Sequence, residues 1–110
     1  MIETIVAIVT CHSREEANRI AEVLVSNELA ACVNIIADVE SCYRWEGEIN
    51  WDSEVLLIIK TTADVVDRVR WCVTKEHSYQ LPEFITFKIR DGSLPYLQWI
   101  VDSVKGHGED

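Results

Sequence analysis

Apolar and polar residues change their spacing several times along this chain, and each change predicts a new element. Residues 2–10 are almost continuously apolar and rich in β-branched side chains, which is typical of a strand that is central in its sheet and covered on both faces. Ser13 then precedes Glu16 by three positions, so each side chain can satisfy an amide at the start of a helix. We expect this helix over residues 14–28. Its apolar stripe consists of Ala17, Ile20, Ala21 and Leu24.

Residues 31–59 alternate between apolar and polar positions, which predicts two strands joined by a turn at Gly47. One face of the first strand comprises Ala31, Val33, Ile35, Ala37, Val39, Tyr43 and Trp45, and the alternation resumes in the second with Ile49, Trp51, Val55, Leu57 and Ile59. Strands of about fifteen residues would each extend roughly 50 Å. That length exceeds the core that a 110-residue domain supplies. The outer half of the hairpin therefore needs cover from elsewhere.

A second helix and a fourth strand are predicted after the hairpin. Thr61 or Thr62 can cap the helix, which should end before Pro82. Its apolar side consists of Val66, Val69 and either Cys72 or Val73. Residues 84–90 alternate again and predict the fourth strand.

A short last helix completes the pattern. We expect a turn at residues 91–92, a cap at Ser93 and an apolar stripe formed by Leu97, Ile100, Val101 and Val104. The full order is that of a ferredoxin-like α+β domain, in which two helices cover one face of a four-stranded antiparallel sheet. We expect one such domain over residues 1–105 and a polar tail over residues 106–110.

The charge balance excludes two classes of partner. Asp and Glu outnumber Lys and Arg by 19 to 10, and the net charge of −9 repels phosphate backbones and anionic lipid headgroups. The longest aliphatic run, residues 55–59, is far shorter than the roughly 20 residues that a membrane-spanning helix needs. Glu3 also stands where a secretory signal would carry basic residues. We therefore expect neither nucleic acid nor a membrane as a partner.

The cysteines indicate a reducing compartment. Cys11, Cys32, Cys42 and Cys72 are scattered, with no CxxC pair and no dense framework. Such cysteines are more typical of free thiols than of disulfides. We expect a cytoplasmic protein.

Cys11 and His12, together with His77 and Glu83, form the arrangement closest to a metal site. A strand end and a loop before another strand can meet at one end of such a sheet, and thiol and imidazole ligands suit copper or zinc. Adjacent residues of an extended chain point to opposite sides, however, and no spacing matches a structural zinc motif. The alternative is that Cys11 packs beneath the loop while His12 is solvated.

Residues 77–83 are a second candidate for function. Pro82 restricts a loop that carries His77, Tyr79 and Glu83, and polar side chains on ordered loops are enriched in binding and catalysis. The alternative is a helix C-terminus where His77 interacts with the helix dipole and Tyr79 packs.

Lys60 and the aromatic residues of the hairpin are the remaining candidates. Lys60 shares a strand face with Glu54, so it either holds an anionic group or is solvated. Tyr43, Trp45 and Trp51 are concentrated near the hairpin tip, beyond the reach of the domain's own core. Aromatic residues of this kind are typical anchors of protein interfaces, and we favour that role over a ligand-binding box.

Motifs for catalysis are missing from the sequence. It contains no GxSxG, phosphate-binding glycine loop, dinucleotide-binding glycines or HExxH. An acylphosphatase-like site would need an arginine in a glycine-containing loop after the first strand, and this segment has Arg14 but no glycine. We expect a non-enzymatic protein.

Several motifs together resemble the CutA divalent-cation tolerance family. They are LAACVNI at residues 29–35, Ser41, Tyr43-x-Trp45-x-Gly47, Glu54, Lys60-Thr61, His77-x-Tyr79-x-x-Pro82-Glu83 and YLQWI at residues 96–100. They cover nearly the whole chain. The resemblance implies a ferredoxin-like domain in a homotrimer, with the long hairpin packed on neighbouring subunits, and a link to tolerance of copper and other divalent cations.

The same resemblance implies where a metal would bind. His77 is the first residue to carry over, with Glu83 in the same motif. Glu76 stands where some members have a second histidine, and Cys11 lies next to the strand-end position that carries a cysteine in members proposed to bind copper. Ser78 stands where the family usually has proline, so we expect a looser loop.

Two functional hypotheses follow. The first is a non-enzymatic homotrimer that binds copper(II) or another divalent cation at His77, Glu76, Cys11 and Glu83, without an organic cofactor. The second is a small-molecule sensor similar to the nitrogen-regulatory signalling proteins. Its ligand clefts would lie between subunits and include Lys60, Tyr79 and Glu83.

Overall fold

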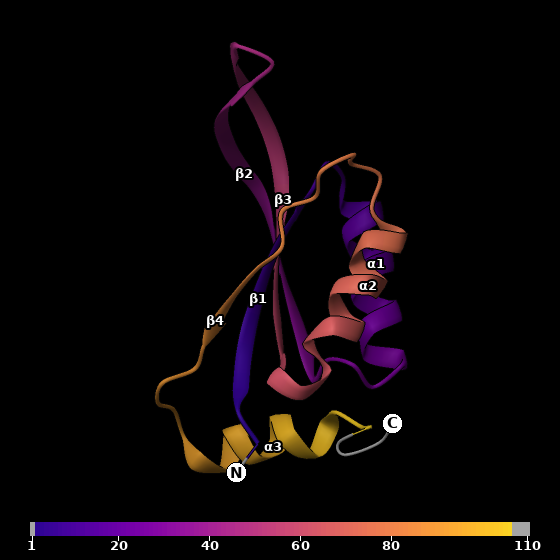
Figure 1. Ribbon diagram of the computed structural model, residues 1–110, viewed down its shortest axis with the longest axis vertical. Helices are drawn as coiled ribbons and strands as arrows, with labels where there is room; N and C mark the ends of the chain where they lie inside the picture. The colour runs from indigo at the N-terminus through magenta and orange to yellow at the C-terminus, as the bar shows by residue number, and fades with distance from the viewer. Residues whose placement is uncertain (1, 107–110) are drawn as a thin grey trace.

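The predicted α+β sheet and helices are present in the computed structural model, which describes residues 2–106. In chain order the elements are β1 (Thr4–Cys11), α1 (Arg14–Ser26), β2 (Cys32–Trp45), β3 (Glu48–Thr62), the 3-10 turn η1 (Ala63–Val65), α2 (Val66–Glu76), β4 (Ile85–Lys88) and α3 (Leu94–Ser103). The four strands pair antiparallel in the order β2-β3-β1-β4 (Figure 1). The last four residues of the expected polar tail, 107–110, lie outside the described residues.

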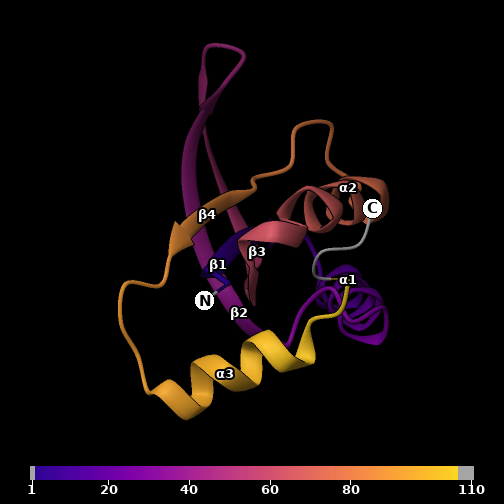
Figure 2. The ribbon, with the colours of Figure 1, turned by 60° about the horizontal axis from the view of Figure 1, so that its bottom comes forward.

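One face of the sheet carries the core. Helices α1 and α2 lie side by side on this face, and α3 crosses the end of the sheet near the N-terminus (Figures 1 and 2). The buried core includes Ala7, Val9, Ile20, Leu24, Leu57, Ile59, Val69 and Val73. Val6 and Ile8 on the opposite face of β1 are only half-buried, so the prediction of cover on both faces is wrong for a single chain. No helix among residues 2–106 is long and apolar enough to cross a membrane.

The helix caps differ in part from the prediction. Ser13 Oγ accepts a hydrogen bond from the Glu16 amide at 3.1 Å, as expected. The Ser93 side chain makes no capping hydrogen bond to α3. Thr62 lies at the start of η1 and donates to Asp64, while Thr61 donates to the Leu29 carbonyl at 2.6 Å. The two threonines at the end of β3 therefore hydrogen-bond to Leu29 and Asp64, and neither side chain caps α2.

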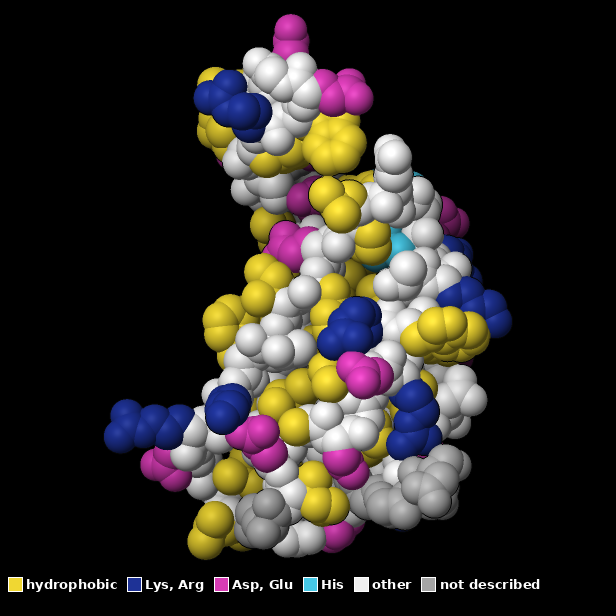
Figure 3. All heavy atoms as spheres, viewed as in Figure 1, with side chains coloured by type: hydrophobic (Ala, Val, Ile, Leu, Met, Phe, Trp, Pro, Cys, Tyr) yellow, Lys and Arg dark blue, Asp and Glu magenta, His cyan; other side chains and the backbone are white. Residues whose placement is uncertain are grey.

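The hairpin of β2 and β3 ends in a two-residue turn. Trp45 pairs with Glu48, and the intervening Glu46 and Gly47 have φ values of 51° and 81°. Positive φ at both turn positions matches the right-handed twist of paired strands. The hairpin projects from the rest of the protein and carries apolar side chains at its tip (Figures 1 and 3).

A register shift interrupts the hairpin halfway along β2. Ile36 pairs with Leu56, but Val39 pairs with Glu54, so β2 contains one additional residue, and Asp38 there has a φ of 62°. Because side chains alternate between faces, an extra residue moves every later side chain of that strand to the other face. The continuous apolar face predicted for β2 is therefore wrong beyond the bulge.

The bulge divides the aromatic residues of the tip between the two faces of the hairpin. Tyr43 pairs with Asn50 and Trp45 with Glu48, whereas Trp51 pairs with Cys42. Directly paired residues of antiparallel strands share a face. Tyr43 and Trp45 therefore lie on one face with Glu54, and Trp51 lies on the other.

Gly47→Ala should destabilise the hairpin by about 1 kcal/mol, because an L-residue with a side chain is disfavoured at positive φ. A Cβ at this position would meet no atom within 4 Å, so backbone strain is the only cost. Chemical denaturation of both proteins measures the loss. Gly47→Asn is the matched control and should lose less, because asparagine tolerates this conformation. Equal losses in the two variants would contradict the explanation.

Candidate metal centre

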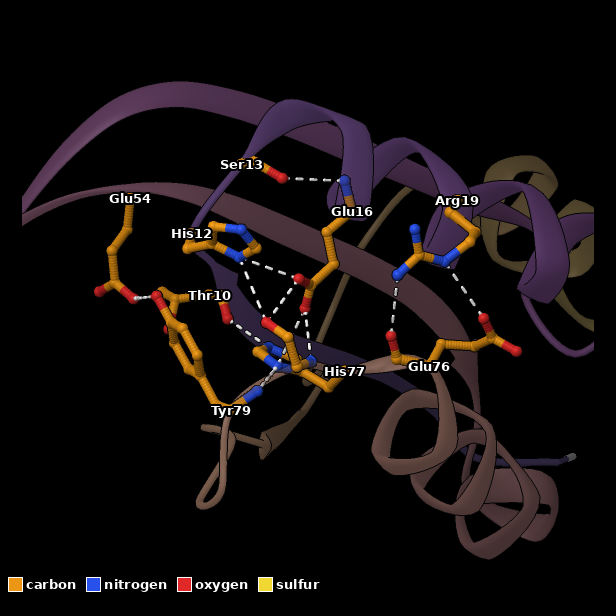
Figure 4. A network of polar contacts seen from close by, with 10 residues as sticks. Thr10, His12, Ser13, Glu16, Arg19, Glu54, Glu76, His77 and Tyr79 are labelled. Carbon is orange, nitrogen blue, oxygen red and sulfur yellow. Dashed lines mark hydrogen bonds and ion pairs between the residues drawn. The ribbon is translucent and has the colours of Figure 1, made fainter.

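Three potential metal ligands meet at one end of the sheet. Cys11 ends β1, Glu16 lies in the first turn of α1, and His77 follows α2. One donor atom from each side chain, sulfur, oxygen or nitrogen, lies within 4.8 Å of the other two. The side chains are buried, with exposed fractions of 0% for His77 and 3% for Glu16, and Cys11 is also fully buried. The fold thus brings together residues from three separate segments, and Figure 4 shows two of them, Glu16 and His77.

The hydrogen bonds of His77 define its tautomer. Nε2 lies 2.7 Å from the Thr10 carbonyl oxygen, and because that oxygen can only accept, Nε2 carries a proton. The Tyr79 amide donates to Nδ1 at 3.1 Å, so Nδ1 carries the lone pair of the neutral ring. An imidazole that donates one N–H to a backbone carbonyl has its other nitrogen oriented for a metal. In His77 that nitrogen is Nδ1, which lies 3.1 Å from Glu16 Oε2.

Glu16 is the most highly connected side chain of the site. It accepts hydrogen bonds from the Ser78 amide at 2.9 Å and the Ser78 hydroxyl at 2.7 Å. His12 Nδ1 lies 2.9 Å from Oε1. Burial acts to raise the pKa of Glu16, but the two Ser78 hydrogen bonds act against it and, with the charge that His77 and His12 carry when protonated, lower the pKa below its usual value. Glu16 is therefore a buried carboxylate at neutral pH.

Cys11 is held as a neutral thiol. Burial, followed by the negative charges of Glu16 and Glu54, raises its pKa to about 12. A thiolate is the form that binds metals. A metal ion at this site would therefore have to displace the thiol proton.

The remaining predicted ligands lie outside this cluster. Glu76 forms an ion pair with Arg19, with 3.3 Å between Oε1 and Nε (Figure 4). Glu83 Oε1 lies 3.5 Å from the Thr10 hydroxyl. Sequence reasoning assigned Glu16 only to the helix cap and missed its place beside His77. The Ser78 substitution is the signal that could have found it, because serine has an N–H that proline lacks.

The loop after α2 is held by this network. Both the amide and the hydroxyl of Ser78 bind Glu16, and the Tyr79 amide binds His77. The absent proline predicted a looser loop, and these hydrogen bonds are restraints that a proline at position 78 could not provide.

The predicted ligand-cleft residues are separated. Tyr79 and Glu83 line a cavity of about 610 Å³ together with Tyr43 and Trp45. Lys60 contacts Asn34 and Tyr96 instead. Lys60 is six residues from Glu54 along β3, a separation of roughly 20 Å.

A ferredoxin-like domain with sulfur, oxygen and nitrogen donors gathered at one end of its sheet belongs to the class of domains able to hold a transition-metal ion. The model of the CutA1 divalent ion tolerance protein family matches residues 5–103, and the chain belongs to this family. The family resemblance noted in the sequence is thus confirmed.

Relatives and solved structures agree with this assignment. The "Divalent-cation tolerance protein CutA" of Thermus thermophilus is 41% identical over 95 residues, covering 86% of this chain and 92% of its own length. A solved divalent cation tolerance protein from the same organism has a TM-score of 0.91 at 38% identity, covering 93% of this chain and 99% of that one. CutA1 from Oryza sativa has a TM-score of 0.92 at 41% identity, covering 94% and 95% of the two chains.

Some relatives are much longer than this chain. The chloroplastic CutA proteins of Oryza sativa and Arabidopsis thaliana are each 41% identical over 104 residues. The matched region spans 59% and 57% of their respective lengths. The reported names give no support to the hypothesis of a sensor similar to nitrogen-regulatory proteins.

Glu16 should make folding stability dependent on acid pH. The pKa of Glu16 is lower in the folded protein than in the unfolded chain, where it is about 4.3. Its contribution to the free energy of unfolding is therefore complete above the unfolded-state pKa and is lost as pH falls through the folded-state pKa. Wild-type protein should therefore lose more stability between pH 6 and pH 3 than Glu16→Gln. Denaturation at each pH measures this difference.

Glu15→Gln is the matched control, because Glu15 is the exposed neighbouring carboxylate of α1. It should keep the wild-type pH dependence. If Glu15→Gln flattened the profile as much as Glu16→Gln, the burial and hydrogen bonds of Glu16 could not be the cause.

Proposed function

We propose that this protein is a non-enzymatic metal-binding protein that holds a divalent transition-metal ion at Cys11, Glu16 and His77. The observation that carries the proposal is the approach of three different donor atoms to within 4.8 Å of one another. Membership of a family described by divalent ion tolerance supports it. The proposed ligand set keeps His77 and Cys11 from the sequence hypothesis and replaces Glu76 and Glu83 with Glu16.

The donor set favours copper or zinc over magnesium or calcium. Thiolate and imidazole suit copper and zinc, whereas magnesium and calcium prefer sites made only of oxygen ligands. His77 Nδ1 would have to exchange its hydrogen bond from the Tyr79 amide for the metal. Cys11 would have to release its proton. Metal binding should therefore be accompanied by proton release and should weaken as pH falls.

The test is calorimetric titration of the whole protein with Zn²⁺, a redox-inactive probe, with Cu²⁺ and Mg²⁺ for comparison. Wild-type protein should bind Zn²⁺ and Cu²⁺ far more tightly than Mg²⁺, and the affinity should fall as pH falls, because protons compete with the metal for its ligands. Cys11→Ser, Glu16→Gln and His77→Ala should each lose at least about tenfold in affinity.

Cys72→Ser is the control for loss of a thiol. Cys72 is also buried, and burial likewise raises its pKa, but it lies outside the donor cluster. This variant should bind Zn²⁺ like the wild type. Unchanged binding in both Cys11→Ser and His77→Ala would refute the proposed site.

The proposal includes a homotrimer. Large apolar side chains remain exposed on one chain, at the hairpin tip and on the edge strand β4: Trp45 (43%), Ile49 (65%), Trp51 (65%), Ile85 (48%) and Phe87 (53%). An exposed strand edge and apolar patches of this kind are typical of surfaces that associate. Assembly would cover the part of the hairpin that its own domain leaves bare.

Trp45→Ala should weaken this assembly. Removing an aromatic anchor from a packed interface typically costs about 2 kcal/mol or more, here once per subunit. Sedimentation equilibrium should show a shift from trimer to monomer, and the melting temperature should become more dependent on protein concentration.

Trp71→Ala is the control for loss of a tryptophan. Trp71 on α2 is 65% exposed and lies away from the hairpin. It should leave the oligomeric state unchanged. A wild-type mass of 12.6 kDa at micromolar concentration would rule out the trimer.

A cytoplasmic location is also part of the proposal. All four cysteines are free thiols, which suits a compartment that keeps thiols reduced. Relatives named as chloroplastic and periplasmic show that the family occupies more than one compartment.

A further inference from the structure

Tyr79 makes hydrogen bonds at both of its ends, and both acceptors are buried. Its amide donates to His77 Nδ1 at 3.1 Å, and its hydroxyl donates to Glu54 Oε2 at 2.7 Å. The exposed fraction is 0% for the His77 side chain and 8% for Glu54. Glu54 lies on β3 and His77 follows α2, so Tyr79 joins a candidate metal ligand to a strand of the sheet (Figure 4).

The hydrogen bond from the Tyr79 amide occupies the place of a metal ion. The neutral ring of His77 has a single nitrogen lone pair, on Nδ1, and the amide proton of Tyr79 already lies on it. A zinc ion bound to imidazole lies about 2.0–2.1 Å from the nitrogen, along the same direction. The amide proton and a metal ion cannot be on Nδ1 together. Metal binding at His77 therefore requires the Tyr79 amide to move away.

The hydroxyl of Tyr79 opposes that movement. It donates to a buried carboxylate on a paired strand, where Glu54 pairs with Val39 across the hairpin. Hydrogen bonds to a charged acceptor are about twice as strong as those between neutral groups. The Tyr79 ring also packs against the His77 ring, with 4.7 Å between the ring centroids. This contact limits rotation of the ring about its own backbone, so a shift of the amide also moves the hydroxyl away from Glu54.

We propose that Tyr79 restrains metal binding at His77 and thereby sets the affinity of the candidate metal centre. While the hydroxyl is on Glu54, the amide stays on Nδ1, and both hydrogen bonds are lost when a metal ion binds. Tyr79 is thus a positioning residue and not a ligand. The inference rests on the proposed metal-binding function and adds a residue that regulates it.

The test is calorimetric titration of full-length Tyr79→Phe with Zn²⁺ at neutral pH, beside the wild type. The wild type loses a charge-assisted hydrogen bond when the metal binds, whereas the variant has no hydroxyl and loses none. Tyr79→Phe should therefore bind Zn²⁺ about tenfold more tightly than the wild type. A residue that only supports the fold of the site would have the opposite effect, because its loss would disorder the ligands and weaken binding.

Tyr96→Phe is the matched control for loss of a phenolic hydroxyl. The Tyr96 hydroxyl lies 3.5 Å from Lys60 Nζ. Tyr96 belongs to α3, which crosses the end of the sheet where β1 begins, whereas Cys11 is at the other end of β1. This variant should bind Zn²⁺ like the wild type.

Hydrogen exchange of the Tyr79 amide provides a second test on the wild type. In the metal-free protein this amide donates to a buried nitrogen and should exchange slowly. Zn²⁺ should speed its exchange, although ligand binding generally stabilises a protein and slows exchange. This measurement needs no substitution, so it decides the question even if Tyr79→Phe does not fold.

Equal or weaker Zn²⁺ binding by Tyr79→Phe would overturn the proposal. So would an equal gain in Tyr96→Phe, or a Tyr79 amide that exchanges no faster with Zn²⁺ than without it. These outcomes leave the proposed function standing as long as the wild type binds Zn²⁺ and His77→Ala does not. A wild type that binds no Zn²⁺ would refute the metal site and, with it, the role of Tyr79.

Discussion

The buried carboxylate of Glu16 holds together the end of the sheet where the candidate metal donors meet. Glu16 lies in the first turn of α1, yet its oxygens contact Ser78 and His77, which follow α2. A buried charge is stable only when its hydrogen-bonding capacity is filled. Ser78 fills it through two donors, and this fixes the loop on which His77 and Tyr79 lie. The position of the candidate metal site therefore depends on one side chain of α1.

Tyr79 connects the candidate metal site to the hairpin through opposite ends of the same residue. Its amide donates to His77 Nδ1 and its hydroxyl donates to Glu54. A metal on Nδ1 would displace the first hydrogen bond. Burial and the Glu54 contacts raise the pKa of the Tyr79 hydroxyl, which keeps it a donor.

Regular periodicity predicted most of the fold, and it failed where the backbone departs from that periodicity. The alternation around Gly47 located the hairpin and its turn because both strands keep a period of two there. The same alternation concealed the bulge, since Ala37, Asp38 and Val39 continue the apolar–polar pattern while the backbone inserts a residue. Glu16 was missed for a related reason. Its spacing from Ser13 satisfies a local rule, whereas its principal partners lie more than sixty residues away.

The bulge makes the chemistry of the outer hairpin depend on residue count as well as residue identity. If the pairing of Ile36 with Leu56 continued without the extra residue, every side chain from Val39 to Trp45 would lie on the opposite face of the hairpin. Tyr43 and Trp45 would then leave the side of Glu54, and Cys42 and Arg44 would take their place. A substitution in this segment changes one contact, whereas a shift of the strand pairing by one residue exchanges the whole surface. Relatives that differ here in length should therefore be compared by strand pairing before their residues are compared by type.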